Sequence, residues 1–407
     1  MGARRRLPRV AAATMTAGML ALGVLAGCVP TDPLPGPATT TTLQPGTPTT
    51  PVGDDLVRLN QIQLIGSHNS YHVAPPTAIL DLLRWAASIA PDVAGHLGNP
   101  NSLDYTHATI DQQLLRGLRT FELDIYADPD GGRFSNPILM GLVGGSDPLL
   151  PTGLDVPGFK ILHIADIDWR SRCSSLDVCL GIMRQWSDAH PGHLPVIINL
   201  ELKGSGLPAP FTGTPVLPFD AAQLDAVDAA LRADLGDKLL TPDDVRGDAP
   251  DLRTAVSTTG WPTVRDSRGK FLVFMDNADT RDAYLVGHPS LRGRAMFTSS
   301  GDGEPDGAIL KLNEPGDGSE IAAKVAEGYL VRTRADADLL EAWNNDISRR
   351  DVTFASGAQV IHSDFPQGEP WLNGYEVTFG TPVAARCDPV NTTPATCTPQ
   401  ALVEPSP

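Results

Sequence analysis

The chain has 407 residues, of which 41% are hydrophobic, so it is long enough and apolar enough to bury a large core. A barrel of alternating strands and helices uses about 250 residues or more, which favours one large domain over two equal ones. The formal net charge of -17 argues against a nucleic-acid partner and against simple electrostatic attraction to anionic lipid, because both require a basic surface. We expect an acidic, monomeric protein.

The first 27 residues have the pattern of an export signal. Arginines at positions 4, 5, 6 and 9 come before an apolar stretch from Val10 to Leu25, and Leu25-Ala26-Gly27 leads into Cys28. This pattern resembles a bacterial lipoprotein signal, in which cleavage before the cysteine leaves its thiol to be acylated. It predicts a signal peptide over 1–27, lipidation of Cys28, and an exported protein anchored on the extracytoplasmic side of a bacterial cell membrane. An ordinary secretory signal with small residues before its cleavage site is the alternative.

The mature chain divides into three parts by composition. Residues 29–53 are dominated by Pro and Thr, which predicts an extended tether over 28–53. From residue 54 short apolar runs alternate with helical patterns, and we place the folded domain at 54–383. Residues 384–407 read as an irregular tail.

Within the domain, strand-like runs recur along the chain. They lie at 61–66, 119–125, 159–164, 195–202, 270–275, 295–298 or 308–312, 329–333 and 358–363. Helical patterns separate them: Asp220 is expected to cap a helix that ends at Gly236, and Thr109 with Gln112 to form a capping box. This alternation predicts an α/β fold, a (β/α)8 TIM-like barrel, with long loops at 72–108, 127–158 and 203–218.

Four cysteines remain after Cys28, and in an exported chain they are expected to form disulfides. Pairing of neighbours, Cys173 with Cys179 and Cys387 with Cys397, is the simplest of three connectivities. A zinc site is the alternative, but neither pair has the short spacing or nearby histidines of zinc motifs.

Acidic, amide and histidine side chains gather at the ends of the first four predicted strands. They are His68, Asn69, Glu122, Asp124, His163 and Glu201. Barrel enzymes place their sites at the carboxyl ends of the strands. Three carboxylates and one amide oxygen fit calcium better than zinc or iron, and two histidines remain to move protons. A cation with an acid/base pair is what phosphodiester cleavage needs.

A later acidic loop partly matches the pattern of a calcium-binding EF-hand loop. The loop that starts Asp302-x-Glu304-x-Asp306-Gly307 has the beginning of an EF-hand pattern but lacks a Glu at the twelfth position. We therefore predict no calcium site there.

Four motifs carry a resemblance to a known family. They are Gly66-Ser67-His68-Asn69-Ser70-Tyr71, Arg119-Thr120-Phe121-Glu122-Leu123-Asp124, Ile161-Leu162-His163 and Val196-Ile197-Ile198-Asn199-Leu200-Glu201. Together they resemble the catalytic half of calcium-dependent phosphoinositide-specific phospholipase C, and most of all its bacterial single-domain members. The match is specific over 60–205 and weaker over 206–365.

The resemblance implies a role for each residue. His68 would stabilise the pentavalent transition state, and His163 would protonate the diacylglycerol leaving oxygen. Asn69, Glu122, Asp124 and Glu201 would bind Ca²⁺, with one of the Glu122 and Asp124 carboxylates helping to deprotonate the inositol 2-hydroxyl.

Cations after the later strands would hold phosphate groups of the substrate. The residues in question are Lys203, Lys311 and Arg332. The implied reaction is calcium-dependent cleavage of phosphatidylinositol-type phospholipids to diacylglycerol and cyclic or open inositol phosphate.

Two alternatives stay open. A glycerophosphodiester phosphodiesterase shares the barrel, an E-x-D pair and two histidines, but usually has His-Arg-Gly where this chain has His68-Asn69-Ser70. A catalytically silent, lipid-anchored protein that binds a headgroup is the other, although retention of both histidines and all four proposed ligands argues against it.

Overall fold

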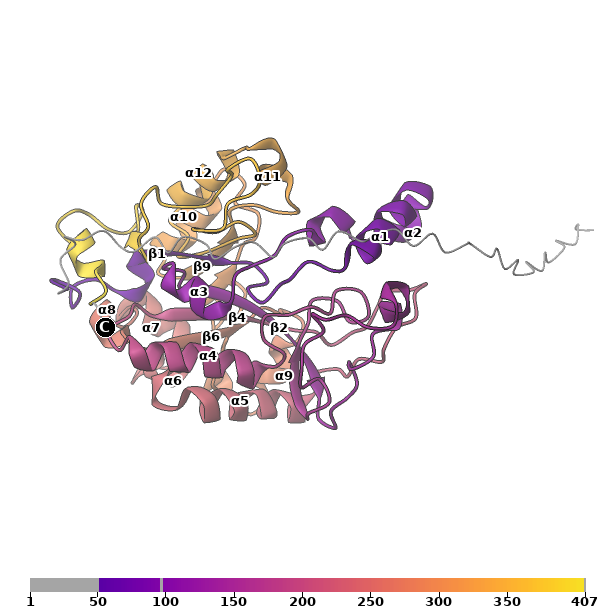
Figure 1. Ribbon diagram of the computed structural model, residues 1–407. Coiled ribbons are helices and arrows are strands. Elements are labelled where there is room, and N and C mark those ends of the chain that lie inside the picture. Colours follow the sequence, from indigo (N-terminus) through magenta and orange to yellow (C-terminus); the bar gives the residue numbers. More distant parts are fainter. Residues whose placement is uncertain (1–50, 96–97, 406–407) are drawn as a thin grey trace, which may run out of the picture. The chain divides into compact units, whose positions relative to one another are not determined.

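Parallel strands form a closed ring at the centre of the computed structural model, which describes residues 51–95 and 98–405 (Figure 1). The ring strands in the described chain are β1 (Ile62–Ser67), β2 (Thr120–Asp128), β4 (Val196–Leu202), β6 (Phe271–Met275), β7 (Phe297–Thr298), β8 (Ile309–Lys311), β9 (Leu330–Arg334) and β10 (Val360–Ser363). Each is hydrogen-bonded in parallel to its neighbours in that order, and β10 returns to β1. An isolated parallel bridge between Ser299 and Ile309 joins β7 to β8. The predicted α/β barrel is confirmed.

Two strand predictions need correction. The segment predicted as a third barrel strand at 159–164 forms β3 (Gly158–Ile161), which runs antiparallel to β2 with Ile161 opposite Ile125. A parallel partner would need a crossover helix. Residues 129–157, all described, form no α-helix, only the 3₁₀ turn η4 (Ile138–Val143). The prediction allowed one strand at either 295–298 or 308–312, but both segments contain strands, β7 and β8. The additional strand takes the place in the ring that β3 does not occupy.

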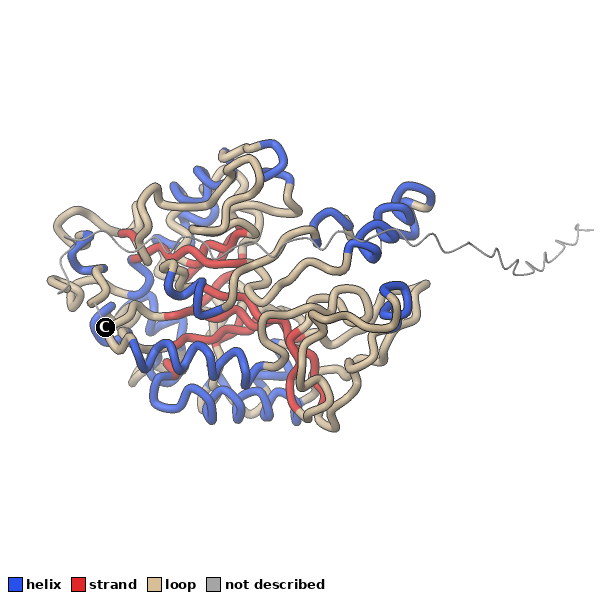
Figure 2. The backbone as a smooth tube through the Cα atoms, in the orientation of Figure 1, coloured by secondary structure: helices blue, strands red, loops and turns tan. Residues whose placement is uncertain are grey.

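Helices lie outside the strands (Figure 2). The α-helices of the described chain are α1 (Thr77–Ile89), α2 (Pro91–Ala94), α3 (Ile110–Leu115), α4 (Leu176–Ala189), α5 (Ala221–Leu235), α6 (Pro242–Arg246), α7 (Leu252–Thr258), α8 (Val264–Ser267), α9 (Arg281–Leu285), α10 (Ser319–Ala326), α11 (Leu340–Asn344) and α12 (Ser348–Ala355). Asp220 caps α5 through the backbone N–H of Gln223, as predicted. The predicted capping box before α3 is wrong, because the Thr109 side chain makes no cap hydrogen bond.

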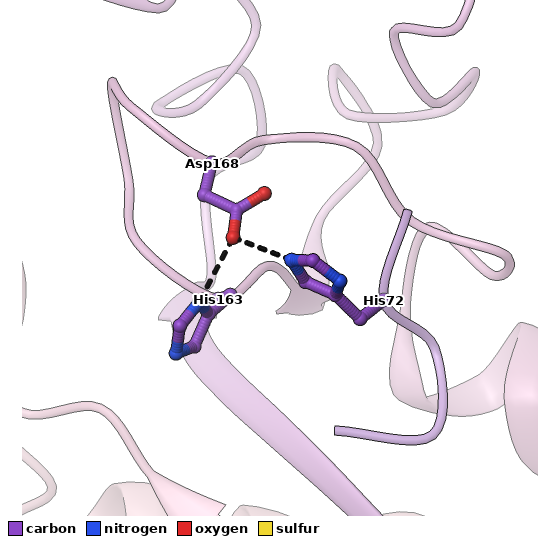
Figure 3. Close-up of side chains that lie close together, drawn as sticks. All are labelled: His72, His163 and Asp168. Carbon is purple, nitrogen blue, oxygen red and sulfur yellow. Dashed lines mark hydrogen bonds and ion pairs between the residues drawn. The ribbon is translucent and has the colours of Figure 1, made fainter. Parts of the chain in front are cut away.

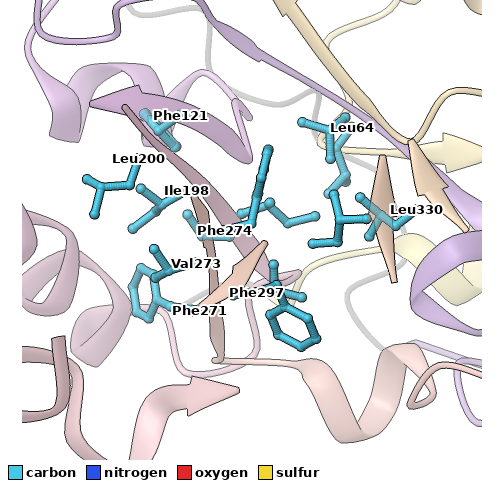
Figure 4. Close-up of a cluster of buried hydrophobic side chains, with 14 of the residues drawn as sticks. Leu64, Phe121, Ile198, Leu200, Phe271, Val273, Phe274, Phe297 and Leu330 are labelled. Carbon is cyan, nitrogen blue, oxygen red and sulfur yellow. The ribbon is translucent and has the colours of Figure 1, made fainter. Parts of the chain in front are cut away.

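The core lies within and around the ring of strands. Ring strands such as β6, with Phe271–Met275 all buried, are apolar on both faces because side chains fill the ring inside and helices cover it outside. Figure 4 draws part of this core, with side chains from β1, β2, β4, β6, β7 and β9 packed together. This rigid ring positions the strand ends that carry the site.

Both ends of the described chain lie at the pole where the ring strands begin. The backbone N–H of Val52 donates to the carbonyl of Gln400 at 3.4 Å. The predicted irregular tail, 384–407, contains β11 (Arg386–Cys387), which pairs antiparallel with β1, and the 3₁₀ helix η7 (Pro399–Leu402). Glu404 forms an ion pair with the buried Arg119 just before β2. The tail therefore closes the pole opposite the strand ends that carry the predicted site.

Both predicted disulfides, Cys173–Cys179 and Cys387–Cys397, are present, and they displace the zinc alternative. No helix in the described part of the chain is long and apolar enough to cross a bilayer. The predicted signal peptide, the lipidation site Cys28 and the tether up to residue 50 lie outside the described residues.

Candidate active site

Three predicted calcium ligands meet where β2 passes the carboxyl ends of β1 and β4. Glu122 and Asp124 are two residues apart on β2 and point to the same side of the strand, and Asp124 lies directly opposite Glu201 on β4. Their nearest carboxylate oxygens all lie within 4.8 Å of one another. Such a gathering of like charges needs a cation to balance it.

Protein cations supply part of that balance. Lys203 Nζ lies 2.9 Å from Asp124 Oδ2 and 2.8 Å from Glu201 Oε1. Although burial opposes the charged form, these two carboxylates raise the pKa of Lys203 above its usual value. On the other side, Arg332 donates to Glu122 Oε2 at 2.6 Å. Lys203 and Arg332, which were predicted to bind phosphate groups of the substrate, therefore pair with carboxylates of the cluster in this structure.

The two carboxylates of β2 differ in their ease of ionisation. Burial raises the pKa of Asp124 well above its usual value. The nearby Lys203 lowers this pKa, but Glu201 and Glu122 raise it further. Burial acts in the same direction on Glu122, but Arg332 and His68 outweigh it and hold the pKa of Glu122 well below its usual range. Asp124 thus carries most of the unbalanced electrostatic cost of the cluster.

The donor set fits a calcium ion. Asp124 Oδ1 is buried and makes no hydrogen bond, so one oxygen of the cluster is left for a cation. Asn69 has a left-handed backbone conformation (φ 46°), and its amide nitrogen donates to the Tyr105 hydroxyl at 3.3 Å, which leaves the amide oxygen as a ligand. The next residue, Ser70, exchanges backbone and hydroxyl hydrogen bonds with Glu122, which ties this loop to β2. Carboxylate and amide oxygens are the ligands that calcium prefers.

His68 is held by an aspartate from the last ring strand. Its Nδ1 lies 2.7 Å from Asp364 Oδ1, and its Nε2 lies 3.9 Å from Glu122 Oε1. Asp364 is bound in turn by Arg334 at 3.0 Å. Burial raises the pKa of Asp364, but Arg334 and His68 lower it to about 2. Because this carboxylate only accepts, the ring proton of His68 resides on Nδ1 and Nε2 faces the site.

His163 reaches the same edge by a different route. Since β3 runs antiparallel to β2, the chain descends toward the ring and delivers His163 just beyond Ile161. One oxygen of Asp168, Oδ2, lies 2.9 Å from His163 Nδ1 and 2.7 Å from His72 Nε2 (Figure 3). The other ring nitrogen of His72 lies 3.0 Å from the Tyr105 carbonyl. Asp168 therefore orients His163 and leaves its Nε2 for substrate.

Burial and the neighbouring charges shift the pKa values of His163 and Asp168. Burial lowers the pKa of His163; Asp168 raises it, while Lys203 and His72 lower it, and the net shift is downward. For Asp168, burial is outweighed by His72 and His163, which lower its pKa to about 2. Asp168 is thus a carboxylate at any ordinary pH.

The remaining predicted cation, Lys311, lies at the end of β8 and pairs with Asp276 rather than with the carboxylate cluster. Arg332 is buried and also donates to Asn313, so its guanidinium is committed on two sides. Lys203 and Lys311 keep 19% and 26% of their side chains exposed against 2% for Arg332, which makes them the more accessible cations.

Four side chains of this site are absent from the predicted set: His72, Asp168, His362 and Asp364. His362 lies 2.9 Å from Glu122 Oε2, and it and Asp364 come from the end of β10. The rule that found Glu201, a polar side chain at the end of an apolar strand, also finds these two at the end of the predicted strand 358–363. His72 and Asp168 lie in loops that carry no periodic pattern.

Comparison with known proteins was made on sequence and on structure. The family model described as calcium-dependent phosphoinositide phospholipase C matches residues 57–389. No curated protein matches the sequence. The apo calcium-dependent phosphoinositol-specific phospholipase C of Pseudomonas sp. is similar in structure, with a TM-score of 0.50 and 17% identity over 83% of this chain and 98% of its own.

Two further solved structures have similar values. The myoinositol complex of the Pseudomonas sp. enzyme gives a TM-score of 0.50 and 15% identity over 82% of this chain and 96% of its own. The calcium-dependent phosphatidylinositol-specific phospholipase C of Streptomyces antibioticus gives a TM-score of 0.46 and 17% identity over 76% of this chain and 95% of its own. The family match covers most of the folded domain, so the chain belongs to the calcium-dependent phosphoinositide phospholipase C family and is a phosphoric diester hydrolase.

Proposed function

We propose that this enzyme cleaves phosphatidylinositol-type phospholipids to diacylglycerol and a cyclic inositol phosphate. The observation that carries the proposal is a pair of histidines, each held by a buried aspartate, at the strand ends that hold the carboxylate cluster. The side chains of His68 and His163 are 19% and 20% exposed, whereas Asp364 and Asp168 are 2% and 0% exposed. The rings therefore face the solvent-accessible side and the acids stand behind them.

The chemistry follows from these orientations. The inositol 2-hydroxyl attacks phosphorus, forming a ring P–O bond, and loses its proton to one of the Glu122 and Asp124 carboxylates. The bond between phosphorus and the glycerol oxygen breaks, and the Nε2–H of His163 protonates that oxygen to release diacylglycerol. His68, in the doubly protonated form that keeps Nδ1–H on Asp364, donates its Nε2–H to a phosphoryl oxygen as negative charge develops on that oxygen.

We propose that Asn69, Glu122, Asp124 and Glu201 hold a Ca²⁺ ion. When bound, the ion supplies positive charge that offsets the charge on the phosphoryl oxygens. The unpartnered oxygen of Asp124 and the carboxylates gathered within 4.8 Å support this assignment. Lys311, Lys203 and, far less exposed, Arg332 are our candidates for contacts to phosphate groups of the substrate, in decreasing order of accessibility.

We further propose that the enzyme is exported and anchored to the membrane through an acylated Cys28. The support is the sequence Leu25-Ala26-Gly27-Cys28 after a basic and apolar segment. The Pro- and Thr-rich stretch that follows would connect the anchor to the catalytic domain.

The function is tested by incubating purified protein with phosphatidylinositol, with and without a calcium chelator, and following products by ³¹P NMR. Inositol cyclic phosphate that forms only with calcium is the expected result. Glycerophosphodiester cleavage without action on the intact lipid would assign the protein to the alternative phosphodiesterase. No turnover at all would leave a headgroup-binding protein.

The metal assignment has its own measurement, calcium titration by calorimetry. Asp124→Asn is expected to weaken calcium binding at least about tenfold, because it removes one charged ligand from the cluster. Glu304→Gln is the control, since Glu304 lies in the acidic loop that is paired with Arg281. Equal calcium affinity in the two variants would contradict the ligand assignment.

A further inference from the structure

An apolar pocket of about 280 Å³ lies among the loops that follow the first ring strands. Its wall includes Leu83 and Ala86 of α1, Ile138 of η4, Ile167 and Phe211. Asp166 and Thr212 supply the polar lining, and no lysine or arginine of the described chain lines it. A pocket without cations does not suit a phosphorylated headgroup, whereas its lining suits hydrocarbon.

The walls of the pocket are held in place by one strained residue. Asp166 has a left-handed backbone (φ 73°), which is uncommon for a non-glycine residue. Its carboxylate accepts hydrogen bonds from the backbone N–H of Ile138 at 3.0 Å and from the Thr214 hydroxyl at 2.7 Å. Three separate loops, around 138, 166 and 214, are therefore fastened together at the pocket, which is built rather than incidental.

The pocket shares a wall with the segment that carries the general acid. Ile167 lines the pocket, and the next residue, Asp168, binds His163. Residues 164–168 form a tight turn, closed by hydrogen bonds between the backbones of Ile164 and Asp168. The pocket is thus on the side of the site where His163 would protonate the departing diacylglycerol.

We propose that this pocket is an acyl subsite that takes the glycerol-proximal part of one acyl chain of the lipid substrate. The proposal rests on the proposed function, because an acyl chain lies beside His163 only if the leaving group that His163 protonates is diacylglycerol. Its size fits a segment of one chain and not a whole diacylglycerol. Trp85 of α1 and Ile138 are 59% and 56% exposed, so apolar surface continues outward on two of the elements that form the pocket.

The test uses a series of phosphatidylinositols with acyl chains of about four, six and eight carbons, presented as monomers below micelle formation. Burying one methylene is worth about 0.8 kcal/mol, so kcat/KM of the wild type should rise about fourfold for each methylene that enters the pocket, then level off. Ala86→Trp fills the pocket and should make kcat/KM independent of chain length. Ala87→Trp, one residue along the same helix and outside the lining, should keep the wild-type dependence.

A second readout does not need catalysis. A fluorescent polyene fatty acid is titrated into each protein, and Ala86→Trp should bind it at least tenfold more weakly than the wild type or Ala87→Trp. Thr212→Trp, at an exposed loop position of the same wall, serves as the second filling variant if Ala86→Trp unfolds.

The outcomes separate this inference from the function. Turnover that is independent of chain length in the wild type, or chain-length dependence that survives both filling variants, overturns the acyl subsite and leaves the phospholipase activity standing. If the wild type cleaves no phosphatidylinositol, the function fails and the probe decides: binding lost in the filling variants supports the subsite, and equal binding in all proteins refutes it.

Discussion

Asp168 binds two histidine rings through one carboxylate oxygen, and this contact sets the state in which His163 can act. A carboxylate only accepts hydrogen bonds, so His163 must carry a proton on Nδ1 and present Nε2 outward. Asp364 does the same for His68. The two aspartates touch no reacting atom in the proposed mechanism; they are positioning residues that act through the rings they hold.

Replacing Asp168 by Asn should lower kcat by about 100- to 10,000-fold, with a smaller effect on KM. An asparagine offers its amide N–H₂ to the ring as readily as its oxygen, so it stabilises the wrong tautomer of His163. Steady-state kinetics on phosphatidylinositol in mixed micelles measures the change. Asp155→Asn, at an exposed acid of a neighbouring loop, is the control, and a wild-type kcat for Asp168→Asn would refute the positioning role.

The pH dependence of kcat/KM for Asp168→Asn gives a second, independent test of the role of His163. Burial lowers the pKa of His163 and Asp168 raises it, while Lys203 and His72 lower it. A general acid works while protonated, so activity falls as the pH rises through its pKa. Removing the carboxylate lowers the pKa of His163 further, and the alkaline limb of kcat/KM for Asp168→Asn should move to lower pH. A limb that moves upward would contradict the assignment of His163 as the acid.

Most of the site side chains that the sequence predicts are placed by ring strands, and His163, which follows β3, is the exception. Glu122, Asp124 and Glu201 could be found because the carboxyl ends of parallel strands meet at one edge, so polar residues there are brought together whatever the loops do. Asp168 could not, because its position depends on a tight turn after an antiparallel strand. Its two hydrogen bonds are a property of that turn and leave no mark in the spacing of residues.

The element that departs most from prediction is β3. Its apolar pattern is the same whether the strand runs parallel or antiparallel, since residue spacing records which faces are buried and not the direction of the chain. The deciding information was the absence of an α-helix between β2 and β3. The departure has a functional result, because an antiparallel β3 leads the chain back from the end of β2 toward Asp124 and delivers His163 there.

The contribution of the tail to the free energy of unfolding can be measured through its disulfide. The Cys387–Cys397 disulfide closes a sequence separation of 10 residues and begins at the last residue of β11, which pairs with β1. Loop-closure entropy predicts that the Cys387→Ser, Cys397→Ser double variant loses about 2 to 3 kcal/mol of unfolding free energy. Urea denaturation of the oxidised proteins measures this. The wild type under reducing conditions is the control, and an unchanged midpoint would show that the tail docks without its bridge.

At the scale of the whole molecule, the candidate active site and the two ends of the described chain lie at opposite ends of the ring strands. The site lies at the carboxyl ends, while Val52 and the tail lie at the pole where the strands begin. The barrel could be predicted because strands and helices alternate along the chain between the long loops. Its closure through both β7 and β8 could not, because each is only two or three residues long.

Attachment is tested by replacing Cys28 with Ala in the bacterial host. Labelled palmitate should enter the wild type and not the variant, and the variant should move from the membrane fraction to the soluble exported fraction. Cys28→Ala removes the thiol that the proposed lipoprotein pathway modifies, and it leaves the sequence of the folded domain unchanged. Membrane retention of the variant would contradict the lipid anchor and favour an ordinary secretory signal.

The junction of Val52 with the tail has a consequence for which lipid the enzyme meets. If Cys28 is acylated as proposed, the tether joins the domain at the pole opposite the catalytic site. The roughly 24 residues between Cys28 and Val52 can span at most about 80 Å, which is long enough for the domain to turn over. Lipid arriving from outside the cell surface is met face-on, whereas lipid of the enzyme's own membrane is reached only by inversion on the tether.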